Sequence, residues 1–157
     1  MKIRRIIFII LSCLWMTVIF CFSSRDADES EKDSYKVGLA VGKNVVHDFE
    51  KQSEEKQMEF AKKIDHPVRK TAHATEYAVL GMFLIGVFYP FKKYYLFSFL
   101  CSFVYSVTDE VHQLFVPGRS GQPLDVLIDS LGAFLGILIL LGIIKLIDKR
   151  KRKTNMN

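Results

Sequence analysis

The sequence has few of the residues and motifs on which metal, redox or nucleophilic sites are usually built. Its 157 residues include only three cysteines and four prolines. Cys13, Cys21 and Cys101 all lie in apolar runs without a CxxC pair, which argues against a metal knuckle or a redox pair. No HExxH zinc motif and no GxSxG nucleophile elbow occurs. We therefore expect the cysteines to be small core or lipid-facing residues, and we do not expect covalent catalysis.

A nucleic-acid partner and a cleaved signal peptide are both disfavoured. The net charge of +5, from 22 Lys and Arg against 17 Asp and Glu, could indicate nucleic-acid binding. The basic residues instead flank long apolar runs, as they do beside membrane spans. The first run, Ile6 to Phe22, follows MKIRR but is long for a signal peptide and ends in bulky residues. It therefore predicts an uncleaved membrane helix.

Four apolar runs are long enough for helices that cross a hydrocarbon core of about 30 Å. They lack strand alternation, and lipid leaves main-chain polar groups no partner outside the segment, so helices are predicted. The predicted spans cover residues 6–24, 69–89, 93–115 and 125–147 and form an all-α integral membrane four-helix bundle, with 1–157 as a single domain. Pro67, preceded by Asp65, predicts the first turn of the second span. Gly132 and Gly136 form a small-xxx-small pair that predicts close helix packing.

A polar loop over residues 25–66 separates the first two spans. Val37, Val41, Val45 and Phe49 recur every four residues, which is typical of a short amphipathic helix on a membrane or on the bundle. A solvated, mobile connector fits the same composition, and the two interpretations stay open.

Basic residues next to the span ends predict the orientation in the cell membrane. They occur in residues 1–5, at Lys92 and Lys93, and from Lys145 to Lys153. Four spans put these segments on one side, which we predict to be cytoplasmic with both termini. The 25–66 loop also carries many Lys and Arg, so density near the spans, and not the total count, supports this orientation.

Polar and ionisable residues recur at one depth, near the predicted extracytoplasmic face. Counting about 20 residues from each cytoplasmic anchor gives this set: Ser23, His73, Glu76, Asp109, Glu110, His112, Gln113, Asp125 and Asp129. Spacings of three and four residues put each helix's members on one face. A charge at the membrane centre costs roughly 2.5–3.5 kcal/mol and is tolerated where such groups meet one another or a wet cavity. The set predicts a functional site, with stabilisation of helix ends, as for Asp125, as the alternative.

Basic residues lie close to this set in the sequence. The segment FVPGRSGQP is rich in turn residues, so Arg119 could fold back over the acids as a counter-ion. Arg69 and Lys70 are further candidate partners for the acids.

Three segments resemble the VanZ-like family of bacterial membrane proteins. They are FSS at the end of the first span, RKTAHATEYAVLG in the second, and YSVTDEVHQLFVPGRSGQPLDVLIDSLGAFLG across the third and fourth. The resemblance implies a multi-pass protein of the cell envelope and, from the member that names the family, low-level resistance of Gram-positive cells to teicoplanin-type glycopeptide antibiotics. The residues that match the family's polar pattern are His73, Glu76, Asp109, Glu110, His112, Gln113, Arg119 and Asp125. Asp129 departs from it, because asparagine is more often expected there, and makes the site more acidic.

Two classes of function remain open. In the first, the site binds a membrane-lipid head group, a wall precursor or a glycopeptide antibiotic. Its binding residues are then Ser23, Arg69, Gln113, Arg119, Asp125 and Asp129.

In the second class, the chain is an intramembrane enzyme acting on an envelope lipid or a lipid-linked precursor. His73 or His112 would be the general base, and Glu76, Asp109 or Glu110 the acid or base. Alternatively His73, Glu76, Asp109 and His112 would bind a divalent cation. A structural role, in which the 25–66 loop contacts a partner protein, is a third option. The oligomeric state is not predicted.

Overall fold

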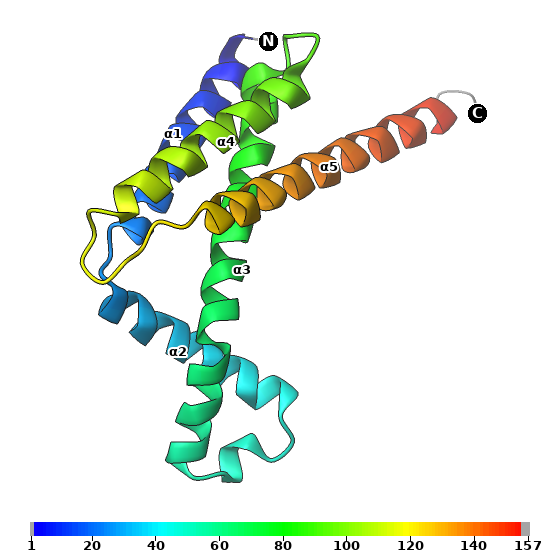
Figure 1. Cartoon of the computed structure of the whole chain (residues 1–157). Coiled ribbons are helices and arrows are strands. Elements are labelled where there is room, and N and C mark those ends of the chain that lie inside the picture. The colour runs from blue at the N-terminus through cyan, green and yellow to red at the C-terminus, as the bar shows by residue number, and fades with distance from the viewer. Residues whose placement is uncertain (1, 155–157) are drawn as a thin grey trace.

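The computed structural model describes residues 2–154, and within that range the regular structure is entirely helical. The elements are α1 (Lys2–Ser23), α2 (Ala27–Val45), the short 3-10 helix η1 (Phe49–Lys51), α3 (Glu54–Phe88), α4 (Tyr94–Gln113) and α5 (Pro123–Thr154) (Figure 1). This confirms the all-α prediction.

Three helices, α1, α3 and α5, are long and apolar enough to cross a membrane. Helix α4 has 20 residues, but its last turns carry Asp109, Glu110, His112 and Gln113, which lower its mean hydropathy. The described helices therefore indicate a membrane protein with three candidate spans, and a fourth span through α4 stays a prediction.

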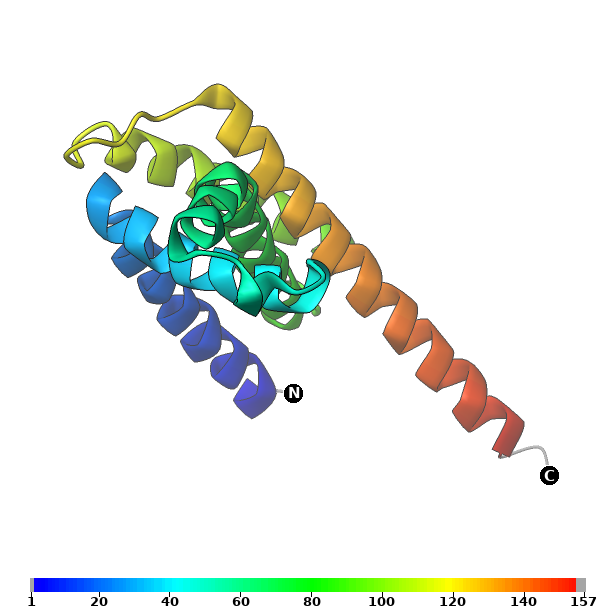
Figure 2. The same ribbon diagram turned by 90° about the horizontal axis from the view of Figure 1, so that it is seen from below.

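Helix α3 is the central element of the fold, because it contacts α1, α2, α4 and α5. Helices α1 and α4 lie along its C-terminal half, whereas α5 crosses it steeply and extends away from the other helices (Figures 1 and 2). The buried core consists of Ile19 of α1, Tyr77, Leu80 and Leu84 of α3, and Ala133 of α5, and it lies along α3, which both other helices contact. This arrangement does not confirm a compact four-helix bundle.

Helix α3 begins at Glu54, well before the predicted start near residue 69, and runs through Pro67 without a break. The prediction that Pro67 occupies a first turn behind an Asp65 cap is therefore wrong. Asp65 instead pairs with Arg69 within the helix, and it accepts a hydrogen bond from Ser34 of α2. Packing of α2 along this part of α3 outweighs the local preference of proline for a helix start. With 35 residues at 1.5 Å each, α3 is about 50 Å long.

The 25–66 loop is folded, so of the two open interpretations the structure supports the helix. Helix α2 starts after Asp26, whose carboxylate accepts the main-chain N–H of Glu29 at 2.8 Å. Its buried face consists of the small residues Ser34, Gly38 and Gly42. Its valine stripe, Val37, Val41 and Val45, stays exposed. The helix therefore packs on α3 through small residues and leaves its apolar stripe unburied.

Helices α3 and α5 approach closely at two glycines. A Cβ atom on Gly132 would lie 2.1 Å from the carbonyl oxygen of Ala74, and one on Gly136 would lie 2.2 Å from that of Ala78. The main chains of α3 and α5 are in contact at these positions, so a side chain at Gly132 or Gly136 would have no room. This confirms that the glycine pair allows close packing.

We expect Gly136→Val to destabilise the protein by about 3 kcal/mol, at the upper end of the usual overpacking cost, because the atom it would meet belongs to the main chain. Chemical unfolding of the detergent-solubilised protein measures this loss. Gly142→Val is the matched control, because a Cβ there meets nothing within 4 Å. Equal losses in the two variants would contradict the close-packing argument.

Candidate functional site

The polar ends of four helices converge in the structure. Ser23 Oγ of α1 donates a hydrogen bond to Asp109 Oδ2 of α4 at 2.8 Å. Ser106 Oγ of α4 donates to Asp129 Oδ2 of α5 at 3.0 Å. Lys70 of α3 forms an ion pair with Asp125 of α5. Residues of α1, α3, α4 and α5 therefore meet at one end of the structure, and the depth of that end in a membrane stays a prediction.

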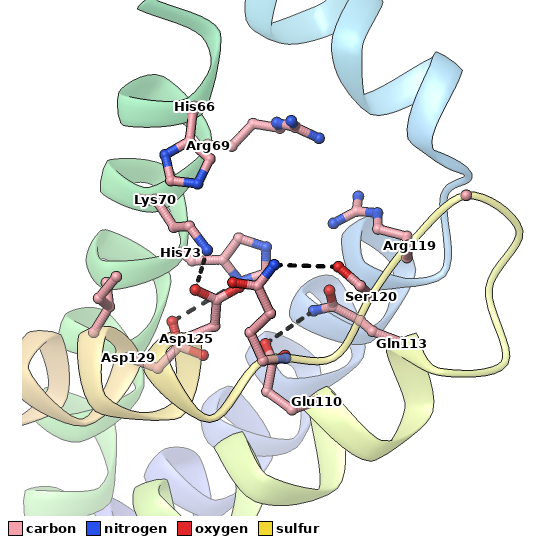
Figure 3. A pocket seen from close by; sticks show the side chains of 13 residues that line it. His66, Arg69, Lys70, His73, Glu110, Gln113, Arg119, Ser120, Asp125 and Asp129 are labelled. Atoms are coloured by element: carbon pink, nitrogen blue, oxygen red, sulfur yellow. Dashed lines mark hydrogen bonds and ion pairs between the residues drawn. The ribbon is translucent and has the colours of Figure 1, made fainter.

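A cavity of about 160 Å³ opens at this polar end, between α3, α4, the α4–α5 loop and α5 (Figure 3). Its lining is polar or charged except for Gly118 and Ile128. Among the predicted site residues, Arg69, His73, Glu110, Gln113, Arg119, Asp125 and Asp129 line it. The volume suffices for a few water molecules or for a small anionic group.

The basic side chains around the cavity differ in their partners. Lys70 pairs with Asp125, and Arg69 Nη2 lies 2.8 Å from Asp65 Oδ2. Lys70 therefore pairs with an acid of the predicted site, whereas the partner of Arg69 is Asp65, which lies outside the predicted set. Arg119 instead donates from Nε to the carbonyl oxygen of Arg25 at 3.1 Å and from Nη2 to that of Phe22 at 3.4 Å. Its guanidinium has no carboxylate within ion-pair distance among the described residues.

The position of Arg119 follows from the loop before it. Gly118 has a φ of +72°, a left-handed conformation that turns the chain back toward the helices. Arg119 therefore folds back over the site as predicted, but without the predicted ion pair to its acids among the described residues. In Figure 3 it faces the cavity opposite Arg69. Burial lowers the pKa of Arg119, and the nearby charge of Arg69 lowers it further. An anion between the two guanidinium groups would offset both effects.

Glu110 holds the α4–α5 loop in place. Its Oε2 accepts the main-chain N–H of Gln122 at 2.9 Å, and Gln113 Nε2 lies 3.4 Å from its Oε1. The observed contacts make Glu110 an anchor of the loop that carries Arg119.

His73, Asp109 and Asp129, which we call the His–Asp–Asp cluster, come together from three helices. One ligand atom from each residue lies within 4.8 Å of the other two. His73 Nδ1 is 3.9 Å from Asp129 Oδ1. Of the four predicted metal ligands, His73 and Asp109 belong to this cluster. Asp129, predicted as a binding residue, is its third member.

Glu76 and His112 lie outside the cluster. Glu76 lines a second cavity of about 250 Å³, and its buried Oε2 has no hydrogen-bond partner. The ring of His112 stacks on Phe20 with centroids 4.5 Å apart, and its Nε2 lies 3.0 Å from Ser24 Oγ. The structure therefore does not bring His112 together with His73.

Sequence reasoning missed two contributors. Taken singly, Ser106 did not stand out from the other serines of the sequence. Ser98, Ser102 and Ser106 nevertheless recur at intervals of four, and all three are buried on one face of α4. That spacing, continued by Asp109 and Gln113, was a usable signal. Gln122 acts through its main-chain N–H, which no sequence pattern reveals.

Residues 8–145 match the sequence model of a protein family described as VanZ/LLP1. The matched segment begins within α1 and ends within α5, so it includes every residue that lines the polar cavity. The match confirms the resemblance seen in the sequence motifs. No curated protein and no solved structure matches the chain.

The Lys70–Asp125 pair, whose side chains are 19% and 17% exposed, should contribute to stability more than a surface pair. We expect Lys70→Ala and Asp125→Ala each to cost about 3 kcal/mol, because each leaves a partly buried charge unpaired. The double variant should lose about 1–3 kcal/mol less than the sum. The exposed Lys36–Asp33 pair is the control, with coupling below about 1 kcal/mol. Strictly additive losses at Lys70 and Asp125 in denaturant unfolding would count against the pair.

Proposed function

The chain belongs to the VanZ/LLP1 family, and from its site we propose that it binds the anionic head group of an envelope lipid or a lipid-linked wall precursor. The observation that carries this proposal is the state of Arg119. Its guanidinium faces a polar cavity, main-chain carbonyls fix it in place, and it lacks a carboxylate partner among the described residues. A fixed cation of this kind favours an external anion.

The geometry of arginine suits a phosphate or carboxylate group. A guanidinium has five N–H donors in a planar fork, and two of those on Arg119 are used by carbonyl oxygens. The remaining donors can bind two oxygens of one anion, which a lysine ammonium does less specifically. Arg69 across the cavity supplies a second guanidinium, so an anion between them would relieve their mutual repulsion.

The second cavity favours an amphiphile over a free anion. Its volume is about 250 Å³, and it shares Arg69, His73 and Arg119 with the polar cavity. Its other lining residues include four apolar ones, Phe22, Val37, Val68 and Ala72. A ligand with an anionic head and an apolar tail would match the combined surface.

The proposed orientation places this site at the outer face of the cell membrane, with α4 as the fourth span. At the opposite end, Arg4 lies over the ring of Tyr89 at 5.1 Å and Arg5 over that of Phe91 at 5.4 Å. Lys92 and Lys93 follow directly in the α3–α4 turn. Such a basic end is typical of a cytoplasmic surface.

Low-level protection of a Gram-positive host against teicoplanin-type antibiotics, which the family resemblance implies, is a proposed consequence of this binding. A bound wall precursor would be withheld from the antibiotic. The His–Asp–Asp cluster favours a second candidate function, an enzyme that acts on the same lipid, with His73 as the base and a carboxylate as its partner.

The orientation predicts the labelling of a cysteine at Gln122, an exposed residue beside the cavity. In a background without Cys13, Cys21 and Cys101, Gln122→Cys should react with a membrane-impermeant thiol reagent in intact cells. Lys93→Cys, exposed at the opposite end, is the matched control and should react only after permeabilisation. The reverse pattern would place the site in the cytoplasm.

Head-group binding predicts that Arg119→Gln weakens the affinity for short-chain phosphatidic acid at least about tenfold, because one charge-assisted contact contributes about 1.5–3 kcal/mol. Thermophoresis of the detergent-solubilised protein measures the dissociation constant of the lipid. Phosphatidylcholine with the same tails tests the head group, and Arg150→Gln, exposed near the end of α5, is the matched arginine control. Equal binding of both lipids, or binding unchanged in Arg119→Gln, would refute the proposal. Binding of teicoplanin without binding of the lipid would replace the lipid by the antibiotic.

A further inference from the structure

Two carboxylates at the polar end are buried without a Lys or Arg ion-pair partner among the described residues. The side chains of Asp109 and Asp129 belong to residues that are 3% and 0% exposed. The nearest basic residues of α3 are engaged elsewhere, Lys70 with Asp125 and Arg69 with Asp65. No Lys or Arg lies within ion-pair distance of either buried carboxylate in the described part of the chain. An ionised carboxylate in this state costs several kcal/mol unless another cation neutralises it.

The hydrogen bonds of these carboxylates leave one oxygen of each free. Asp109 Oδ2 accepts from Ser23 Oγ at 2.8 Å and lies 3.4 Å from Gln113 Nε2. Asp129 Oδ2 accepts from Ser106 Oγ at 3.0 Å. Asp109 Oδ1 and Asp129 Oδ1 are buried and have no hydrogen-bond partner. Donors that fix one oxygen and leave the other free orient a carboxylate as the outer shell of a metal site does.

His73 supplies the third group. Its ring and the two carboxylates offer three ligand atoms within 4.8 Å of one another. Ligand atoms about 2.0–2.2 Å from a common tetrahedral ion lie about 3.3–3.6 Å apart, so side-chain movements of up to about an ångström would complete the site. We propose that His73, Asp109 and Asp129 bind one divalent cation, Zn²⁺ or Mn²⁺, that joins α3, α4 and α5.

The donor set determines the class of ion. Ca²⁺ takes six to eight oxygen ligands, and Mg²⁺ favours oxygen with several waters. One imidazole with two carboxylates suits Zn²⁺ or Mn²⁺ better. Three protein ligands leave at least one coordination position open. His73 and Asp129 both line the polar cavity, so an open position directed into the cavity would take a water or an anionic oxygen.

This inference goes beyond the proposed function, because the ion site needs neither lipid nor Arg119. Protonation of the two carboxyl groups is the other way to remove their charge. Metal content distinguishes the two, since protonated carboxyl groups do not hold a stoichiometric cation.

The test uses the full-length protein purified in detergent without chelators. Inductively coupled plasma mass spectrometry should find about one Zn²⁺ or Mn²⁺ per chain. After a chelator removes it, re-addition of the same ion at micromolar concentration should raise the midpoint of thermal unfolding by several degrees, because the ion binds only the folded state. Mg²⁺ and Ca²⁺ at the same concentration should leave the midpoint of thermal unfolding unchanged. Absence of a stoichiometric ion together with no shift on adding Zn²⁺ or Mn²⁺ would overturn the proposal.

Substitutions at the proposed ligands test where the ion binds. His73→Ala and Asp129→Asn should lower its affinity at least about 100-fold, more than the loss of an outer-shell partner usually does. Asp129→Asn keeps the side-chain shape and an acceptor for Ser106, so it remains informative if His73→Ala fails to fold. His112→Ala is the matched control, because His112 is held by Ser24 and Phe20 outside the cluster, and it should keep the ion.

The outcomes separate the two proposals. An ion retained in His73→Ala and Asp129→Asn alike would refute this site. Arg119→Gln should keep the ion while losing phosphatidic acid. Loss of the ion from Arg119→Gln together with retention in Asp129→Asn would also place the ion elsewhere.

Discussion

The close approach of α5 to α3 is the constraint on which the site depends. Gly132 and Gly136 bring the two main chains into contact with Ala74 and Ala78. One turn nearer the polar end, the same crossing places Asp129 beside His73. Any side chain at the glycines would separate the helices by at least the width of a methyl group. A contact of 3.9 Å between His73 and Asp129 would not survive that separation.

The sequence could predict which polar residues gather at one end of the helices, because that follows from regular geometry. Rise per residue placed Ser23 and Asp109 at one level, and the structure joins them by a hydrogen bond. Lys70, named as a candidate partner because it lies close to the acids in the sequence, pairs with Asp125. Periodicity does not record which polar atoms remain unpaired. The partners of Arg119 and the free oxygens of Asp109 therefore required coordinates.

The predicted start of the second span differs most from the structure, and the reason is tertiary packing. Pro67 signalled a helix start, yet α3 passes through it because α2 packs beside the preceding turns and Ser34 bonds to Asp65. Local preference decides a boundary only where no other element contacts it. The predicted stripe of α2 shows the same limit. Its three valines share an exposed face, and the fourth member, Phe49, lies beyond α2 in η1 and is buried. The packing surface of α2 consists instead of small residues.

The positive and negative side chains of the site lie at different depths from its opening. Two guanidinium groups, from Arg69 and Arg119, border the cavity, and the carboxylates of Asp109 and Asp129 lie deeper. An anionic head group would meet the guanidinium groups first. With a cation held by the deeper carboxylates, the same anion would have positive charge on two sides. The two proposals therefore describe compatible parts of one site and remain separable by experiment.

The length of α3 has a consequence for how a ligand would arrive. A helix of about 50 Å exceeds a hydrocarbon core of about 30 Å, and counting back from Phe88 puts Arg69 and His73 near its boundary. If α3 crosses the membrane as proposed, the cavity would lie close to the layer of lipid phosphates. A lipid would reach it by lateral diffusion, at a local concentration far above that of any dissolved molecule. Occupancy of the cavity would then follow the mole fraction of each lipid in the leaflet. The site would have to discriminate among head groups that are always present at high local concentration.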